Sequence, residues 1–127
     1  QPASAESLSA DQHYFQMNGK EVYKTAVKVV PESINLVLDR NQMNIDQISY
    51  MVPHQPSIGI LKNIAKSVGL PFEQVTTNMD KYANTSGATI PLVLDETHKA
   101  GKFKNGDYLL FAAVGAGWTW GTALYKW

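Results

Sequence analysis

The stretch ISYMVPHQ, residues 48–55, decides the fold of this chain. Its first five residues form a compact apolar run between Asp46 and Pro53, which is typical of a buried strand. Ligands in open α/β sheets gather at the carboxyl ends of the strands, and His54 directly follows such an end. A histidine in that place can donate a hydrogen bond or relay a proton. A helix-entry histidine bonded to a neighbour is the structural alternative, and the local pattern leaves both open.

Helical patterns flank this strand on both sides. From about Lys20, apolar residues fall on one face, and Pro31 predicts either a kinked helix or two abutting helices. Residues 60–68 repeat the helical pattern, with Gly69 suited to end it and Pro71 preventing its continuation. Residues 90–100 are a third expected helix, since a proline is tolerated in a first helical turn.

Further strands are expected along the chain. Residues 13–16 and 75–78 are short strand candidates. An apolar strand over 108–114 follows the turn at 105–107, and residues 119–127 alternate as a final strand. Strands that alternate with helices and end in two successive strands predict an α/β sheet of two or three layers that closes with a hairpin.

The composition excludes several classes of protein. The chain has 127 residues, 44% of them hydrophobic and 17% charged, which fits a single globular domain. Eleven basic residues balance eleven acidic ones, so no overall field attracts nucleic acid or an anionic membrane. No apolar run approaches the roughly 18 residues that a membrane span needs. The opening residues show no secretory signal pattern, and we therefore expect a cytoplasmic protein.

Cysteine is absent, which excludes disulfides, thiolate metal sites and a cysteine nucleophile within the chain. The three histidines have no metal-ligand spacing, so we expect no metal. The sequence begins at Gln1 without a Met, and its opening residues are small and polar. We interpret residues 1–15 as a lead-in or severed linker with a possible first strand, ahead of one domain at residues 16–127.

Two further segments are candidates for chemistry. Residues 82–88, YANTSGA, join a strand to a helix, and small side chains there let a ligand approach the backbone. Asn84 would provide a neutral amide donor for a developing oxyanion, although an ordinary helix-capping turn has the same composition. Residues 114–118, VGAGW, permit close backbone approach but are too short for a dinucleotide fingerprint.

Five segments, taken in order, resemble one known family. They are MNGKEVYK at 17–24, VPHQ at 52–55, YANTS at 82–86, GD at 106–107 and GWTWG at 117–121. At these spacings they resemble the carboxy-terminal half of 3-oxoacyl-(acyl carrier protein) synthase III. The resemblance implies an α/β, thiolase-like half-domain with a five-stranded mixed sheet covered by helices. It also implies a decarboxylative Claisen condensation in the initiation of fatty-acid synthesis.

The implied active site is a Cys-His-Asn site whose cysteine belongs to the amino-terminal half. The family's His matches His54 and its Asn matches Asn84, and both would donate hydrogen bonds to the malonyl thioester carbonyl. The glycine loop that serves the other oxyanion falls on Gly115, Ala116 and Gly117. The resemblance also implies pantetheine contacts at Gly19, Tyr23, Ala26, Ser57 and Val114, and carrier-protein docking at Lys24, Lys62 and Lys66.

The same resemblance implies partners but no cofactor. The substrates are carried on coenzyme A and on the phosphopantetheine of acyl carrier protein. The expected partners are the amino-terminal half of the same enzyme, acyl-CoA, acyl carrier protein and a second copy in a homodimer, with no nucleic acid and no membrane. Without its partner half, the chain is expected to expose apolar surface and to lack condensing activity.

Departures from the family's pattern leave alternatives open. The usual His-Gln-Ala-Asn run is His-Gln-Pro-Ser at residues 54–57, and Gly59 stands where an arginine helps to dock the carrier protein. Ala83 replaces a usual glycine, and Ala116 lies within the glycine loop. A divergent acyltransferase or polyketide-type synthase with the same fold is one alternative interpretation, and a non-catalytic pairing domain is another.

Overall fold

A three-stranded mixed sheet forms the centre of the molecule in the computed structural model, which describes residues 3–127. The strands are β1 (Tyr50–Pro53), β2 (Tyr108–Gly115) and β3 (Thr119–Lys126), in the spatial order β1-β2-β3. β1 pairs with β2 in parallel, and β2 and β3 form an antiparallel hairpin. The buried strand expected at residues 48–52 and the closing hairpin are both confirmed.

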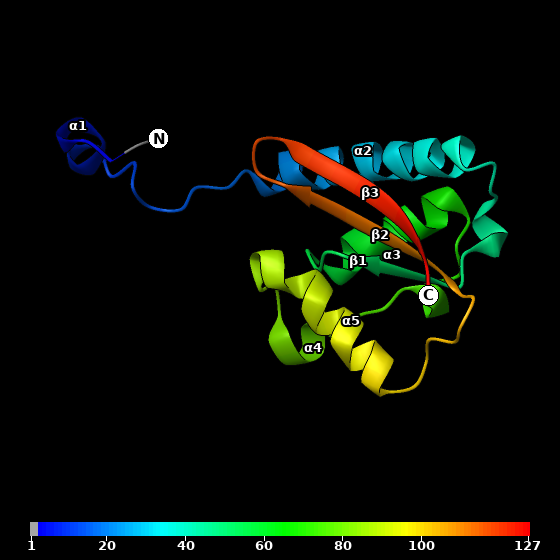
Figure 1. Ribbon diagram of the computed structural model, residues 1–127. Coiled ribbons are helices and arrows are strands. Elements are labelled where there is room, and N and C mark those ends of the chain that lie inside the picture. Colours follow the sequence, from blue (N-terminus) through cyan, green and yellow to red (C-terminus); the bar gives the residue numbers. More distant parts are fainter. Residues whose placement is uncertain (1–2) are drawn as a thin grey trace.

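Helices cover both faces of this sheet (Figure 1). α2 and α3 lie on one face and α5 lies on the other, which makes three layers. The helices are α1 (Ala5–Ser9), α2 (Gly19–Arg40), α3 (Ile58–Val68), α4 (Met79–Tyr82) and α5 (Thr89–Lys99), with short 3₁₀ turns η1 (Ile45–Gln47), η2 (Phe72–Gln74) and η3 (Ser86–Ala88). None of the helices in this part of the chain has the length and apolar character that crossing a membrane demands.

Strand β1 is buried on both sides. Met51 packs in the cluster that includes Ile34 of α2 and Ile64 of α3, whereas Val52 packs with Val93 of α5. Adjacent residues of a strand point to opposite faces, so a strand between two helical layers needs apolar residues throughout. This requirement explains why Met51 and Val52 are both apolar, whereas Ser49, just before the strand, donates its hydroxyl proton to Asp107.

α2 runs unbroken through Pro31, so the expectation of two abutting helices is wrong. A proline inside a helix costs about 3 kcal/mol because it removes one backbone hydrogen bond and crowds the preceding turn. Val30, Ile34 and Leu38 are all buried along the same face. Each such side chain contributes about 1.5–3 kcal/mol on burial, which outweighs the proline and holds the helix together.

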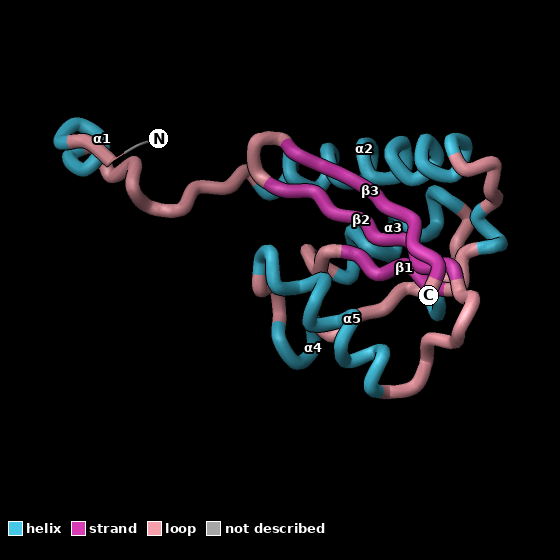
Figure 2. Tube along the Cα trace, in the orientation of Figure 1, coloured by secondary structure: helices cyan, strands magenta, loops and turns pink. Residues whose placement is uncertain are grey.

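The five-stranded sheet is not confirmed, because the described residues form three strands. Residues 13–16 form no strand: they lie in a segment that extends away from the body (Figure 2), where Tyr14 and Phe15 are exposed and no strand lies alongside them. Val75 makes one isolated parallel bridge with Met51, after which the chain turns into α4. A single bridge is too short to count as a further strand.

Replacing Ile34 with alanine should lower the free energy of unfolding by about 3 kcal/mol, because Ile34 is fully buried between α2 and the sheet. Leu36→Ala is the matched control on the same helix, since Leu36 is 50% exposed, and it should cost less than about 1 kcal/mol. Urea denaturation of the two variants measures the difference. Equal losses would contradict this assignment of the core face.

Candidate active site at the carboxyl end of β1

His54 lies immediately beyond the carboxyl end of β1, as expected. Its backbone N–H donates to the carbonyl of Ala112 at 2.7 Å, so the β1–β2 ladder continues through this residue. The side chain is half-buried and lines a small apolar pocket together with Val114 of β2 and Leu61 of α3. The position of the imidazole is therefore set by the sheet as well as by its own contacts.

Gln55, the residue after His54, holds the backbone of the loop that follows β1. This glutamine is fully buried, and its Nε2 donates to the carbonyls of Pro53 and Thr76 at 2.9 and 3.1 Å. Its Oε1 accepts from the backbone N–H of Asn78 at 3.4 Å. A buried amide with all these partners stabilises one loop conformation, because breaking any of them would leave a buried polar group unsatisfied.

The imidazole of His54 contacts Thr89, the first residue of α5. Nδ1 of His54 and Oγ1 of Thr89 are 2.7 Å apart, and the same Oγ1 donates to the carbonyl of Ser86 at 3.0 Å. Burial lowers the pKa of His54 below its ordinary value, and a hydrogen bond to the backbone of Ser86 partly opposes that effect. The ring is accordingly neutral at pH 7.

Asn84 lies in the loop between α4 and α5, and its amide is oriented by the same loop. Oδ1 of Asn84 accepts the backbone N–H of Ser86 at 2.9 Å. This bond uses the amide oxygen and leaves the Nδ2 protons, which are hydrogen-bond donors, for another acceptor. A continuous path of hydrogen bonds now joins the two candidate catalytic side chains, from Asn84 through Ser86 and Thr89 to His54.

The backbone of this loop is unusual at two residues. Ala83 has φ 55° and ψ −147°, and Ser86 also has φ 55°. Residues with a Cβ atom rarely adopt such backbone angles. The φ and ψ angles of Ala83 lie close to a region of conformational space that is almost exclusive to glycine. The family resemblance places a glycine at this position, and the structure shows why.

The glycine loop is the tip of the β2–β3 hairpin. Gly115 ends β2, and Ala116 and Gly117 are exposed in the turn. Gly117 has φ 137°, and a Cβ atom added there would lie 2.7 Å from Oγ1 of Thr119, so glycine is required at this position. Loops at this end of the sheet, after β1, between β2 and β3 and before α5, lie on one side of the molecule (Figure 2).

The residues implied for pantetheine binding differ in their exposure to solvent. Gly19 and Tyr23 are exposed in the first two turns of α2, and exposed Ser57 caps α3 by accepting the N–H of Ile60 at 3.2 Å. Ala26, in contrast, is fully buried in the core.

The three lysines implied for docking lie on the two helices of one layer. Lys62 and Lys66 are exposed one turn apart on α3, and the ammonium of Lys62 lies 5.6 Å from the centre of the Phe72 ring. Lys24 on α2 is exposed and forms an ion pair with Glu21 at 3.0 Å. The charge of Lys24 is therefore partly compensated within its own helix.

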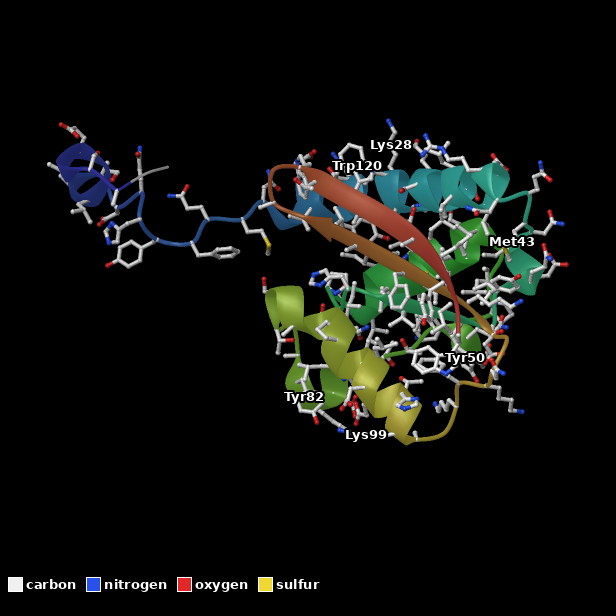
Figure 3. The ribbon with its side chains drawn as sticks, in the orientation of Figure 1. Lys28, Met43, Tyr50, Tyr82, Lys99 and Trp120 are labelled. Carbon is white, nitrogen blue, oxygen red and sulfur yellow. The ribbon has the colours of Figure 1, made fainter. Side chains whose placement is uncertain are left out.

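Large apolar side chains are exposed in several parts of the described chain. Figure 3 shows two of them, Trp120 on the hairpin and Tyr82 at the end of α4, which are 49% and 47% exposed. The others include Tyr14, Phe15, Met17, Ile58, Trp118 and Tyr125. Those that gather into a contiguous patch are candidates for a surface that another polypeptide covers. Within residues 3–127 no group of three or more His, Asp or Glu side chains is arranged to hold a metal ion.

The sequence did not reveal that Thr89 contacts the imidazole of His54, or that Ser86 bonds to both Asn84 and Thr89. Ser86 lies within the segment at residues 82–88, and Thr89 directly follows it. The local sequence pattern does not distinguish a hydroxyl that caps a helix from a hydroxyl that contacts His54. The available signal was weak: a threonine at the start of an expected helix, close in sequence to a candidate amide donor. Thr89 follows His54 by 35 positions in the sequence, and this separation hid their contact.

Replacing Ala83 with glycine should raise the free energy of unfolding by about 1 kcal/mol, because it removes the steric cost of a positive φ. Ala88→Gly is the matched control in the same loop, since Ala88 has φ −81° and ψ −8°. That change should lower the free energy of unfolding by about 0.5–1 kcal/mol. A destabilising effect of Ala83→Gly would contradict the strain assigned to residue 83.

Comparison with known proteins places this geometry in a family. A sequence model described as "3-Oxoacyl-[acyl-carrier-protein (ACP)] synthase III C terminal" matches residues 38–127. Beta-ketoacyl-[acyl-carrier-protein] synthase III of Rhodopirellula baltica is 43% identical over 126 residues, and that of Clostridium acetobutylicum is 45% identical over 111 residues. These alignments cover 99% and 87% of this chain but 36% and 34% of the two relatives.

A solved structure shows the same fold. 3-Oxoacyl-(acyl carrier protein) synthase III of Pseudomonas aeruginosa superposes with a TM-score of 0.90 at 34% identity, over 99% of this chain and 38% of that one. This chain thus spans little more than a third of the length of the relatives that it matches. It belongs to the 3-oxoacyl-(acyl carrier protein) synthase III family, of which it represents the carboxy-terminal domain.

Proposed function

We propose that this chain is half of a condensing enzyme that joins an acyl thioester to malonyl-acyl carrier protein with loss of carbon dioxide. The hydrogen-bonded path from Asn84 to His54 carries the proposal, because it orients two side chains of one site from a single loop. Family membership supports the reaction, since relatives are named for it. The product of such a step is a 3-oxoacyl thioester, which would start fatty-acid synthesis.

His54 and Asn84 serve the malonyl half of the reaction. When the carboxylate of the malonyl group leaves as carbon dioxide, negative charge develops on the thioester carbonyl oxygen as an enolate. Nδ2 of Asn84 and Nε2 of His54 are the atoms not engaged by the Ser86 N–H or by Thr89, and they would donate to that oxygen. Each preorganised donor in a dry site contributes roughly 3 kcal/mol to stabilising such a charge.

The nucleophile must come from elsewhere, because this chain has no cysteine. We assign it to an amino-terminal half that completes the site, and residues 16–127 to the carboxy-terminal domain behind a lead-in at 1–15. The exposed aromatic side chains of the hairpin and of residues 14–17 support such a covering partner. The backbone N–H of Ala116, in the hairpin turn with Gly115 and Gly117, would serve the oxyanion that forms on the acyl cysteine.

The surface of the α2–α3 layer suits the carrier. Gly19, Tyr23 and Ser57 are exposed and Val114 is half-buried beside His54, so these residues remain candidates for the pantetheine arm. Lys62 and Lys66 offer two adjacent cations to an acidic carrier protein, with Lys24 as a weaker third. We further propose that the assembled enzyme is a homodimer in the cytoplasm.

The purified chain alone should produce no 3-oxoacyl product from acyl-CoA and malonyl-acyl carrier protein, whereas addition of the amino-terminal half should restore turnover. In the assembled enzyme, His54→Ala and Asn84→Ala should each lower kcat by roughly 10²–10³, equivalent to about 3 kcal/mol. His98→Ala and Asn63→Ala are matched controls, because both residues are exposed and neither contacts the site. Condensation by the chain alone would overturn the proposal.

Retention of full activity by both His54→Ala and Asn84→Ala in the assembled enzyme would also overturn it. That outcome would favour a domain that only pairs with its partner half. A loss of activity shared equally by the His98 and Asn63 variants would point to the same conclusion, since it would show that the assay responds to folding rather than to the two donors.

A further inference from the structure

Glu96 of α5 binds both ends of α4, the short helix that precedes Asn84. Its Oε2 accepts from Nδ2 of Asn78 at 3.0 Å, and its Oε1 accepts from the ammonium of Lys81. Asn78 directly precedes α4 and Lys81 lies within it, so one carboxylate holds α4 against α5 (Figure 1). None of these three side chains has a role in the function proposed above.

The position of α4 depends on such contacts. It has four residues, and a helix of that length is not stable by itself in water. Met79 packs against the core, and the backbone N–H of Asn78 donates to Oε1 of Gln55 at 3.4 Å. These two contacts hold the beginning of α4, whereas Glu96 also holds its other end through Lys81.

An ionised carboxylate suits this bridge. The hydrogen bond from Lys81, and after it the one from Asn78, lowers the pKa of the Glu96 carboxyl below its ordinary value, so this group is ionised at pH 7. Both oxygens of a carboxylate accept hydrogen bonds, which lets one side chain serve two donors. Asn78 is 3% exposed and the Glu96 side chain is 32% exposed, so the bond between them is partly buried. Hydrogen bonds to an ionised group are stronger than neutral ones.

The loop that carries Asn84 runs between α4 and α5. Ala83, which joins α4 to Asn84, has a positive φ, and a residue with a Cβ atom keeps such a conformation only where its surroundings hold it. Beyond the loop, Thr89 contacts the imidazole of His54. Glu96 follows Thr89 by seven positions, so both side chains lie on the same face of α5. One face of α5 therefore contacts His54 and, through α4, holds the start of the loop.

We propose that Glu96 is a positioning residue for Asn84. By binding Asn78 and Lys81 it holds α4 in place, and with it the loop from which the Asn84 amide reaches the site. The inference rests on the proposed function for its catalytic consequence, because that consequence requires Asn84 to act on the malonyl group. The placement of the loop itself does not depend on the reaction.

Glu96→Gln tests the placement of the loop in the chain itself. The amide keeps the shape of the carboxylate but has one oxygen, so it cannot accept from Asn78 and Lys81 together. Hydrogen exchange measured by NMR should be roughly fivefold faster at two backbone N–H groups, that of Ala83, which is bonded within α4, and that of Ser86, which is bonded to Asn84.

Two control variants accompany this measurement. Asp95→Asn removes an exposed ion pair of the same helix, between Asp95 and Lys99 at 2.8 Å, and should leave exchange at both N–H groups unchanged. Lys81→Arg keeps a cation opposite Glu96 and should retain the exchange rates of the unaltered chain. Unchanged exchange in Glu96→Gln would overturn the proposal, as would equally faster exchange in Asp95→Asn. Lys81→Met, at a side chain that is 57% exposed, repeats the test if Glu96→Gln does not fold.

In the assembled enzyme, the two half-reactions separate positioning from a general weakening of the fold. Glu96→Gln should lower the rate of malonyl decarboxylation about tenfold at saturating substrate, and it should leave acyl transfer to the cysteine and the KM for acyl-CoA unchanged. An equal loss in both half-reactions would overturn the proposal. Unchanged loop exchange in Glu96→Gln, with Asn84→Ala inactive, would refute the role of Glu96 alone. Faster loop exchange, with Asn84→Ala fully active, would refute the proposed function alone.

Discussion

The parallel pairing of β1 with β2 is the constraint on which the site depends. β1 is buried between two helical layers, and a slip of its register by one residue would turn Met51 and Val52 towards the wrong layers. The register is therefore strongly specified, and the ladder carries on to the backbone N–H of His54. A single chain of backbone bonds thus places the imidazole relative to the hairpin.

Beyond that strand end, the site is built from side-chain hydrogen bonds. Gln55 ties the loop after β1 to the segment before α4, and Thr89 ties the imidazole to the start of α5. Asn84 is oriented by a bond within its own loop, at the expense of a positive φ at Ala83 and at Ser86. Strain stored next to a site, and held by surrounding packing, is a common mark of function.

The sequence predicted those parts of the fold that have a strong local period. The strand at 48–52, the helix at 60–68 and the final hairpin were all confirmed. The signals for these elements, which are the spacing of apolar residues and the glycines and prolines that end an element, lie within a few residues of each other. Of the two alternatives predicted at Pro31, two abutting helices were wrong, because packing along α2 outweighs the local effect of proline. Residues 13–16 form no strand because strand formation needs a neighbour, which no local pattern reveals. His54 and Asn84 were found through motifs, whereas Thr89 required the tertiary contact.

The central claim is that His54 and Asn84 act on the malonyl group, separately from the thiol that carries the acyl group. Release of labelled carbon dioxide from malonyl-acyl carrier protein tests this most directly, in an assembled enzyme whose nucleophilic cysteine in the amino-terminal half has been replaced. The account predicts that carbon dioxide is still released without condensation, and that adding Asn84→Ala stops the release. Release that continues unchanged after Asn84→Ala would contradict the account.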